Sequence, residues 1–262
     1  MTDRGSGSPL VLIPGIQGRW EYMRGAVDAL AEWFRVITFP LCGERGWTGA
    51  FDPARRIDNF VDQIDVVLDD RQIARAAICG VSFGGLVAIR FAASRPHRTT
   101  ALIVASTPGP RWHLKRRHEV YARLPWLLGP LFLAEAPWRL RAEIAAAIPN
   151  RRERRRFAWQ QLQTLVSAPL SLSRMAARAR MMAGGDRAND CARITAPTLV
   201  ISGERALDRV VAVDETSEYQ HLIPGARGAM LERTGHLGSI TRPRAFAAIV
   251  REFVASPDRE SF

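Results

Sequence analysis

Residues 80–85 have the sequence GVSFGG, the most informative motif in the chain. It ends a short apolar run at 76–81 and leads into an apolar segment with helical spacing at 83–94. The pattern G-x-S-x-G between a strand and a helix is typical of a nucleophile elbow, a turn too sharp for side chains two positions either side of the serine. We therefore predict a strand, a tight turn that exposes Ser82, and a helix whose N-terminal amides point toward it. The alternative is a glycine-rich turn that only packs a helix against a sheet.

Short apolar runs alternate with helical periodicity on both sides of this stretch, which indicates βαβ units and a parallel sheet. We predict strands at 9–13, 34–39, 76–81, 99–105, 197–202 and 228–232, and helices at about 20–33, 57–71, 83–94 and 243–254. The predicted fold class is therefore α/β, with a mostly parallel sheet of about six strands flanked by helices.

Residues 108–196 interrupt this alternation. Their helical patterns are broken at several prolines, and they contain no convincing strand. We predict a helical cap at 108–196, inserted into a core made of residues 1–107 and 197–262. The aromatic and leucine side chains between Trp112 and Trp138 are expected to pack on the core and to line an apolar pocket.

The cap also holds most of the excess charge. The chain has 37 basic and 26 acidic residues, a net charge of +11, and residues 111–190 alone contribute sixteen basic and six acidic residues. No recognisable nucleic-acid motif accompanies this charge, and positive charge alone is a weak indicator of nucleic-acid binding. We expect a solvated cap surface and no nucleic-acid partner.

A serine nucleophile requires a positioned base, because a serine hydroxyl is weakly nucleophilic near neutral pH. Of the five histidines, His236 lies in the sequence TGHLG at 234–238, directly after the last predicted strand. The flanking glycines suit a loop that carries an imidazole over the edge of the sheet. The other four histidines are expected at the surface, at positions 97, 113, 118 and 221.

The third member of such a site is an acid that orients the imidazole. The run GERALDRV at 203–210 offers Glu204 and Asp208, and Asp214 follows. Asp208 is preferred because Glu204 lies only two residues past the predicted strand. Asp214 is better explained as an N-cap or first-turn acid of the next helix.

The chain order Ser82, Asp208, His236 is the order found in α/β-hydrolases, and the sequence resembles the capped members of that superfamily. The resemblance implies an oxyanion hole formed by two backbone amides, which by position are those of Phe83 and Ile16. The turn PGIQG at 14–18 departs from the family's usual His-Gly-x, although backbone donors do not depend on the side chain. The resemblance also implies that the two leading strands common in the family are missing or reduced.

These residues predict a serine hydrolase that cleaves a carboxylic ester or thioester with an apolar acyl or aryl group. A carbon–carbon bond hydrolase on the same triad is one alternative, and a catalytically silent binding protein on the same scaffold is another. A haloalkane dehalogenase is disfavoured because its nucleophile would be an aspartate where this chain has Ser82. The chemistry requires no cofactor or metal, and the expected partner is a small apolar ester.

The three cysteines lack C-x-x-C spacing and read as reduced thiols. No secretory signal and no apolar run long enough for a transmembrane helix is visible, so we expect a cytoplasmic protein.

Overall fold

The computed structural model describes residues 1–114, 116–182 and 187–255 and contains a seven-stranded sheet of order β1-β3-β2-β4-β5-β6-β7. The strands are β1 Thr2–Arg4, β2 Pro9–Ile13, β3 Arg35–Thr38, β4 Ala76–Val81, β5 Thr99–Ala105, β6 Thr198–Ser202 and β7 Arg227–Met230. Every neighbouring pair is parallel except β1 with β3, so the predicted α/β class is confirmed. The additional strand is β1, a polar edge segment too short to show an apolar pattern.

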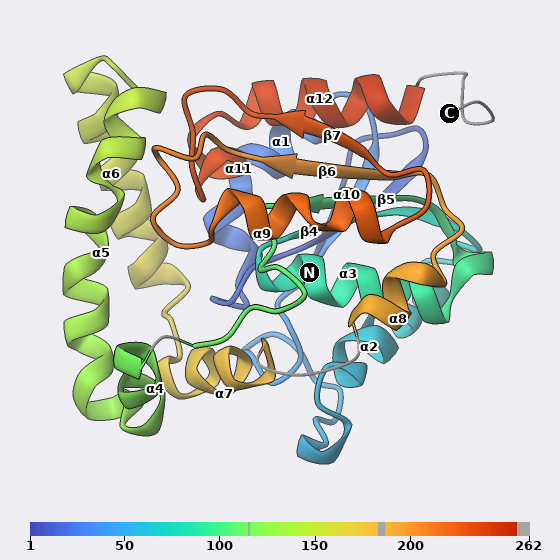
Figure 1. Ribbon diagram of the computed structural model, residues 1–262, viewed down its shortest axis with the longest axis horizontal. Helices are drawn as coiled ribbons and strands as arrows, with labels where there is room; N and C mark the ends of the chain where they lie inside the picture. Colours follow the sequence, from blue (N-terminus) through green and yellow to red (C-terminus); the bar gives the residue numbers. More distant parts are fainter. Residues whose placement is uncertain (115, 183–186, 256–262) are drawn as a thin grey trace.

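Helices cover both faces of the sheet (Figure 1). One face carries α1 Arg24–Leu30, α11 Gly238–Thr241 and α12 Pro243–Ala255, and the other carries α2 Asp58–Asp70, α3 Phe83–Ser94, α8 Arg187–Ala192, α9 Val213–Ser217 and α10 Tyr219–Leu222. The predicted helix at about 20–33 is shorter, because residues 20–23 form a 3-10 turn before α1.

Strand β2 shows how the sequence pattern builds the two apolar layers. Leu10 and Leu12 belong to the cluster under α1 and α12, whereas Val11 and Ile13 belong to the cluster under α2 and α3. Successive side chains of a strand point to opposite faces, so a strand between two layers is apolar throughout. The central strand β4 is buried at all six positions and ends at Val81, directly before Ser82.

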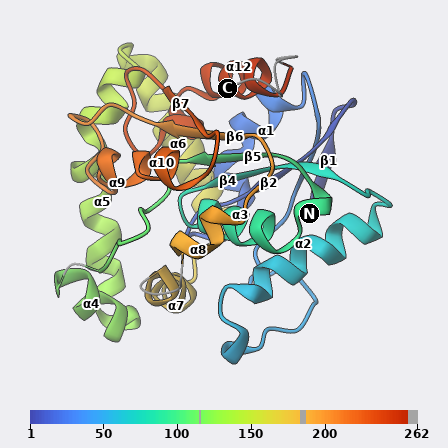
Figure 2. The same ribbon diagram turned by 45° about the vertical axis from the view of Figure 1, so that its right-hand side comes forward.

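Between β5 and β6 the chain forms α4 Arg116–Arg123, α5 Pro125–Ala147, α6 Arg151–Ser167 and α7 Leu172–Met182, followed by α8. No strand occurs among the described residues of this segment. Figures 1 and 2 show α4–α7 grouped at one side of the molecule, with α5 and α6 beyond the arrowheads of β6 and β7. These helices therefore lie at the carboxyl edge of the sheet.

The aromatic side chains of this segment are more exposed than the sequence suggested. Trp112 packs against the core, but Trp126 and Trp138 are 71% and 70% exposed. The Arg141 guanidinium stacks on the Trp138 ring at 3.4 Å, and no described side chain of α6 is buried. An apolar residue in an amphipathic pattern is buried only if another element covers that face, which a local sequence does not specify. Within the described ranges, no helix has the length and apolar character needed to cross a membrane.

Candidate active site

The loops after β2, β4, β6 and β7 all leave the sheet at its carboxyl edge, because these strands are parallel. This edge is where open α/β sheets generally bind ligands. The loops contain Ile16, Ser82, Asp208 and His236, so the fold brings together residues that are separated by up to 220 positions in the sequence.

The elbow, residues 80–85, has the strained geometry that its glycines predict. Ser82 has φ 55° and ψ −120°, a conformation that costs about 1–3 kcal/mol for a residue with a side chain. A Cβ atom on Gly80 would lie 2.1 Å from the Gly84 carbonyl oxygen, and one on Gly84 would lie 2.3 Å from the Ile13 carbonyl oxygen. The Ser82 N–H donates to the Ala105 carbonyl at 2.8 Å, which ties the turn to β5.

His236 reaches Ser82 from the histidine loop, which we define as residues 231–237 between β7 and α11. Its Nε2 lies 3.1 Å from Ser82 Oγ, within hydrogen-bonding distance. Both side chains are largely buried. An imidazole in this position can accept the serine proton. Three of the other histidines, at positions 97, 113 and 221, are exposed, and His118 is partly exposed.

Asp208 faces the second nitrogen of the same imidazole. Its Oδ2 is 3.7 Å from His236 Nδ1, an ion-pair distance that is longer than a hydrogen bond. Its Oδ1 accepts the N–H groups of Val210 and Val211 at 2.8 and 2.9 Å. Burial by itself raises the pKa of Asp208, but the contact with His236 and the two amides outweigh it and hold the pKa below 3.8. Asp208 is therefore a buried carboxylate, fixed by its own loop beside the imidazole.

The two competing acids lie elsewhere. Glu204 Oε1 accepts the Arg233 N–H at 2.6 Å, so this carboxylate braces the start of the histidine loop. Asp214 is in the first turn of α9, exposed, and paired with Arg205.

The two candidate oxyanion donors belong to backbone segments that adjoin Ser82. Phe83 is the first residue of α3, and the first amides of a helix have no partner within it. Ile16 lies in the turn after β2, where the Gly18 N–H donates to the Gly15 carbonyl at 2.9 Å. A Cβ on Gly15 would lie 3.4 Å from Ser82 Cβ, which places this turn against the elbow.

Two buried charged side chains, one on α5 and one on α7, reach these loops. Neither was predicted from the sequence as a site residue. Arg178 of α7 donates to the Ile16 carbonyl at 3.0 Å and to Glu44 Oε1 at 2.7 Å. Glu143 of α5 is 0% exposed and accepts the Leu237 N–H at 2.5 Å. Glu143 interrupts an apolar run at 142–148, which was the available signal, whereas Arg178 lies among many other arginines.

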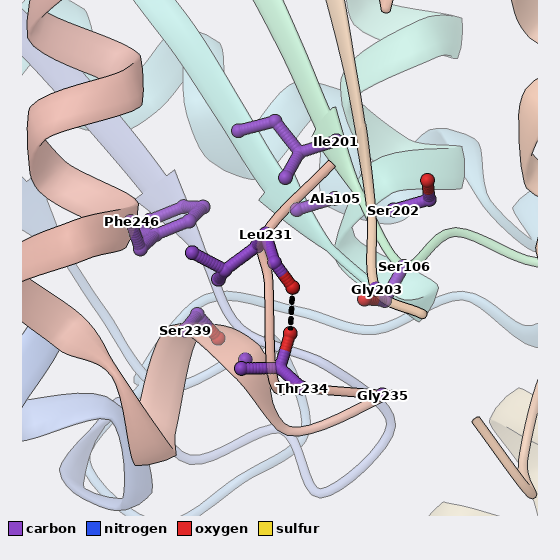
Figure 3. Close-up of a pocket in the computed structure, with 11 residues that line it drawn as sticks. Ala105, Ser106, Ile201, Ser202, Gly203, Leu231, Thr234, Gly235, Ser239 and Phe246 are labelled. Atoms are coloured by element: carbon purple, nitrogen blue, oxygen red, sulfur yellow. Dashed lines mark hydrogen bonds between the residues drawn. The ribbon is translucent and has the colours of Figure 1, made fainter. Parts of the chain in front are cut away.

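Figure 3 shows a cavity behind these loops, lined by the ends of β5 and β6, by Leu231, Thr234 and Gly235 of the histidine loop, and by Phe246 of α12. Thr234 Oγ1 donates to the Leu231 carbonyl at 2.6 Å, which closes the loop on itself. The lining contains neither Ser82 nor His236, although it includes Gly235, the residue before His236. Across the described ranges, no cluster of three or more histidine, cysteine or acidic side chains could hold a metal ion.

Comparison with known proteins gives one family and a set of full-length relatives. The model of the alpha/beta hydrolase family matches residues 10–249. RutD of Pseudomonas syringae, provisionally named a carbamate hydrolase, is 27% identical over 94% of this chain and 93% of its own length. The pimeloyl-[acyl-carrier protein] methyl ester esterase of Nitrosomonas europaea is 26% identical over 93% of this chain and 94% of its own.

A solved structure supports the same fold. The enol-lactonase from Burkholderia xenovorans superimposes with a TM-score of 0.80 at 23% identity, over 97% of this chain and 95% of its own.

Proposed function

The chain belongs to the alpha/beta hydrolase family, and on that premise we propose that it is a serine hydrolase that cleaves a carboxylic ester or thioester. The observation that carries the proposal is the 3.1 Å approach of His236 Nε2 to Ser82 Oγ, with the Asp208 carboxylate beside the other ring nitrogen. A nucleophile within reach of a base, and a base beside an acid, is the arrangement that activates a serine.

In the proposed reaction, Ser82 Oγ attacks the carbonyl carbon of the substrate while His236 accepts its proton. The backbone amides of Phe83 and Ile16 stabilise the oxyanion, and losing one such donor typically costs about 10²–10³ in rate. His236 then donates the proton to the departing alcohol, which leaves an acyl group on Ser82. Water activated by His236 hydrolyses this intermediate, and Asp208 stabilises the imidazolium that forms in both steps.

Two observations support an ester with an apolar acyl or aryl group as the substrate. Phe83 belongs to the large apolar cluster under α2 and α3, and Ile16 packs against that cluster, so the proposed oxyanion hole lies in an apolar part of the molecule. The relative from Nitrosomonas europaea is named as a methyl ester esterase, which supports an ester as the bond that is cleaved.

We further propose that residues 108–196 form a cap over a core of residues 1–107 and 197–262. The contacts of Glu143 and Arg178 with the loops at the carboxyl edge support this division. Residues 115, 183–186 and 256–262 within these ranges lie outside the described residues. A cytoplasmic location is supported by the three free, buried cysteines.

A fluorophosphonate probe, which reacts with activated serines, tests the nucleophile. We expect it to label the wild type and to spare Ser82→Ala. Ser94→Ala is a matched control, because Ser94 lies at the other end of α3 and its hydroxyl contacts the Arg90 carbonyl. Labelling that persists in Ser82→Ala would contradict the assignment, and an unlabelled wild type would support the catalytically silent alternative.

A panel of p-nitrophenyl esters from acetate to dodecanoate tests the substrate class. We expect turnover that varies with acyl length, since an apolar pocket accommodates some chains better than others. If the enzyme is labelled by the probe but hydrolyses no ester or thioester, and instead cleaves a carbon–carbon hydrolase substrate, the proposed ester specificity is wrong. The protein would then be a carbon–carbon bond hydrolase.

A further inference from the structure

Helix α5 places a fully buried carboxylate against the histidine loop. Glu143 is 0% exposed, and its Oε1 accepts the Leu237 N–H, the amide that directly follows His236. Its Oε2 is buried and finds no hydrogen-bond partner among the described residues. Burying a carboxylate is costly unless nearby groups compensate for its charge, so this position calls for a specific explanation.

A second contact joins α5 to the same loop. The Arg233 guanidinium donates to the Ala146 carbonyl from Nε at 2.9 Å and from Nη2 at 2.7 Å. The C-terminal turns of α5 are thus bound to the histidine loop on both sides of His236, at positions 233 and 237. A backbone held at both sides restricts where the imidazole can move.

We propose that Glu143 is a positioning residue for His236, which holds the backbone at Leu237 and supplies a negative charge that favours the protonated imidazole. The imidazole becomes protonated when Ser82 loses its proton, so the charge acts at the step where the nucleophile forms. This inference rests on the proposed function, because it needs His236 to be the base. Part of the active-site geometry then depends on α5, which lies outside the segments that contain Ser82, Asp208 and His236.

The groups around Glu143 act on its pKa in both directions, and burial has the largest effect. Burial raises the pKa of Glu143, and Asp208 on the β6–α9 loop raises it further. The Gly235 and Leu237 amides and the positive charge of protonated His236 act in the opposite direction. Besides His236, the charged side chain that the histidine loop brings to this end of α5 is that of Arg233. The net result is a pKa of Glu143 above its ordinary value.

The test is the rate at which a fluorophosphonate labels Ser82, measured against pH. This readout needs no knowledge of the substrate. Glu143→Gln keeps an oxygen that can accept the Leu237 N–H but removes the charge. We expect labelling about tenfold slower at neutral pH, a fraction of the roughly 10²–10⁴ that a general base contributes, and an acid limb of the profile displaced to lower pH. The limb moves in that direction because the imidazole without the nearby carboxylate is protonated less readily.

Glu135→Gln is the matched control. Glu135 is on the same helix and pairs with Arg117 of α4, away from the histidine loop. We expect the wild-type labelling rate and profile from this variant. Glu143→Ala removes the acceptor as well as the charge, and a displaced imidazole is expected to slow labelling by about 10²-fold. Circular dichroism and thermal melting establish whether each variant is folded, and Glu143→Gln decides the question if Glu143→Ala is not.

The outcomes separate the two proposals. A wild type that is not labelled overturns the proposed function and this role with it. A labelled wild type with a Glu143→Gln variant of unchanged rate and profile overturns the role of Glu143 alone. A slower Glu143→Gln variant with an unmoved acid limb would make Glu143 a structural support only, which also overturns the proposal.

Discussion

The elbow at 80–85 and the histidine loop at 231–237 are both tight turns at the carboxyl edge, but they are held in different ways. The elbow is fixed by close backbone approaches, such as that of Gly84 to the Ile13 carbonyl, and by the bond from Ser82 to β5. The histidine loop is braced by carboxylates from two other segments, Glu204 after β6 and Glu143 on α5.

One half of the proposed site is therefore held by the backbone of the sheet, whereas the other half also depends on contacts with α5. The elbow cannot change without disturbing the central strands, where side chains are closely packed. The histidine loop is also tied to the end of β6, by the Leu231 N–H to the Ser202 carbonyl at 2.8 Å. It depends in addition on contacts with α5, which single substitutions can alter while the fold remains intact.

The largest effect is expected where the histidine loop meets its acid. Asp208→Asn keeps the shape of the side chain but favours the wrong imidazole tautomer, which in a Ser-His-Asp template costs about 10⁴ in kcat. Glu204→Gln keeps an oxygen for the Arg233 N–H and is expected to lose little. Steady-state kinetics of both variants on the best p-nitrophenyl ester checks this ranking. The reverse ranking would make Glu204 the acid.

A pair of glycine substitutions compares the two turns directly. A Cβ at Gly84 would lie 2.3 Å from the Ile13 carbonyl oxygen of the central sheet, and overpacking of this kind costs about 1–3 kcal/mol of stability or more. A Cβ at Gly235 would lie 2.6 Å from the Leu207 backbone, next to Asp208. We expect Gly84→Ala to lower the melting temperature strongly. Gly235→Ala is expected to stay folded and to lose about 10²-fold in kcat/KM, because it displaces His236 from Asp208.

Thermal melting and ester kinetics on the same preparations measure both effects. Gly25→Ala is the control, since Gly25 lies in α1 and its nearest atom would be a Pro243 side-chain carbon at 3.3 Å. Equal losses of stability in Gly84→Ala and Gly235→Ala would contradict the proposed difference, because both turns would then be equally important for the stability of the fold.

The smallest effect concerns stability against pH. The pKa of Asp208 lies below 3.8, so its stabilising contribution is present above that pH and is lost as the pH falls through the folded-state pKa. Burial raises the pKa of Glu143 above 4.5, so its cost appears as the pH rises from 4.5 through the folded-state pKa. As the pH rises through the folded-state pKa of Asp208, the stability of Asp208→Asn should fall relative to that of the wild type. As the pH rises above 4.5, the stability of Glu143→Gln should rise relative to that of the wild type.

Melting temperatures recorded from about pH 3 to 8 check this, and about 1 kcal/mol corresponds to roughly 2–4 °C in a chain of this size. For each variant, the difference between its melting temperature and that of the wild type is plotted against pH. If the two plots slope the same way, the pKa of Asp208 and that of Glu143 are not shifted in opposite directions.

The sequence predicted the elements of the fold well where local patterns are strong. The strands from 9–13 onward and the amphipathic helices near 57–71 and 243–254 occur where the spacing placed them. It missed β1, because a three-residue edge strand has no periodicity to detect. It also placed Trp126 and Trp138 in a packed interior, where the structure leaves them exposed.

For the candidate site, the elbow could be located from the sequence because its constraint is local. Glycines at 80 and 84 leave room for backbone contacts that any larger residue would prevent. The turn therefore requires glycine two residues before and two residues after Ser82, and this spacing can be recognised in the sequence. His236 and Asp208 could be proposed from their places after predicted strands, since the carboxyl ends of parallel strands meet at one edge. Their roles are still proposals that the experiments above test.

The contacts of Glu143 and Arg178 could be found only in the assembled fold. Each lies on a helix whose local sequence is compatible with several faces being buried, and each finds its partner 94 and 162 residues away. A side chain's burial and charge compensation depend on which elements pack against it, and that is set by the assembled fold. Local motifs therefore predict where a nucleophile can form, whereas the side chains that contact the surrounding loops follow from the packing of α5 and α7 at the edge of the sheet.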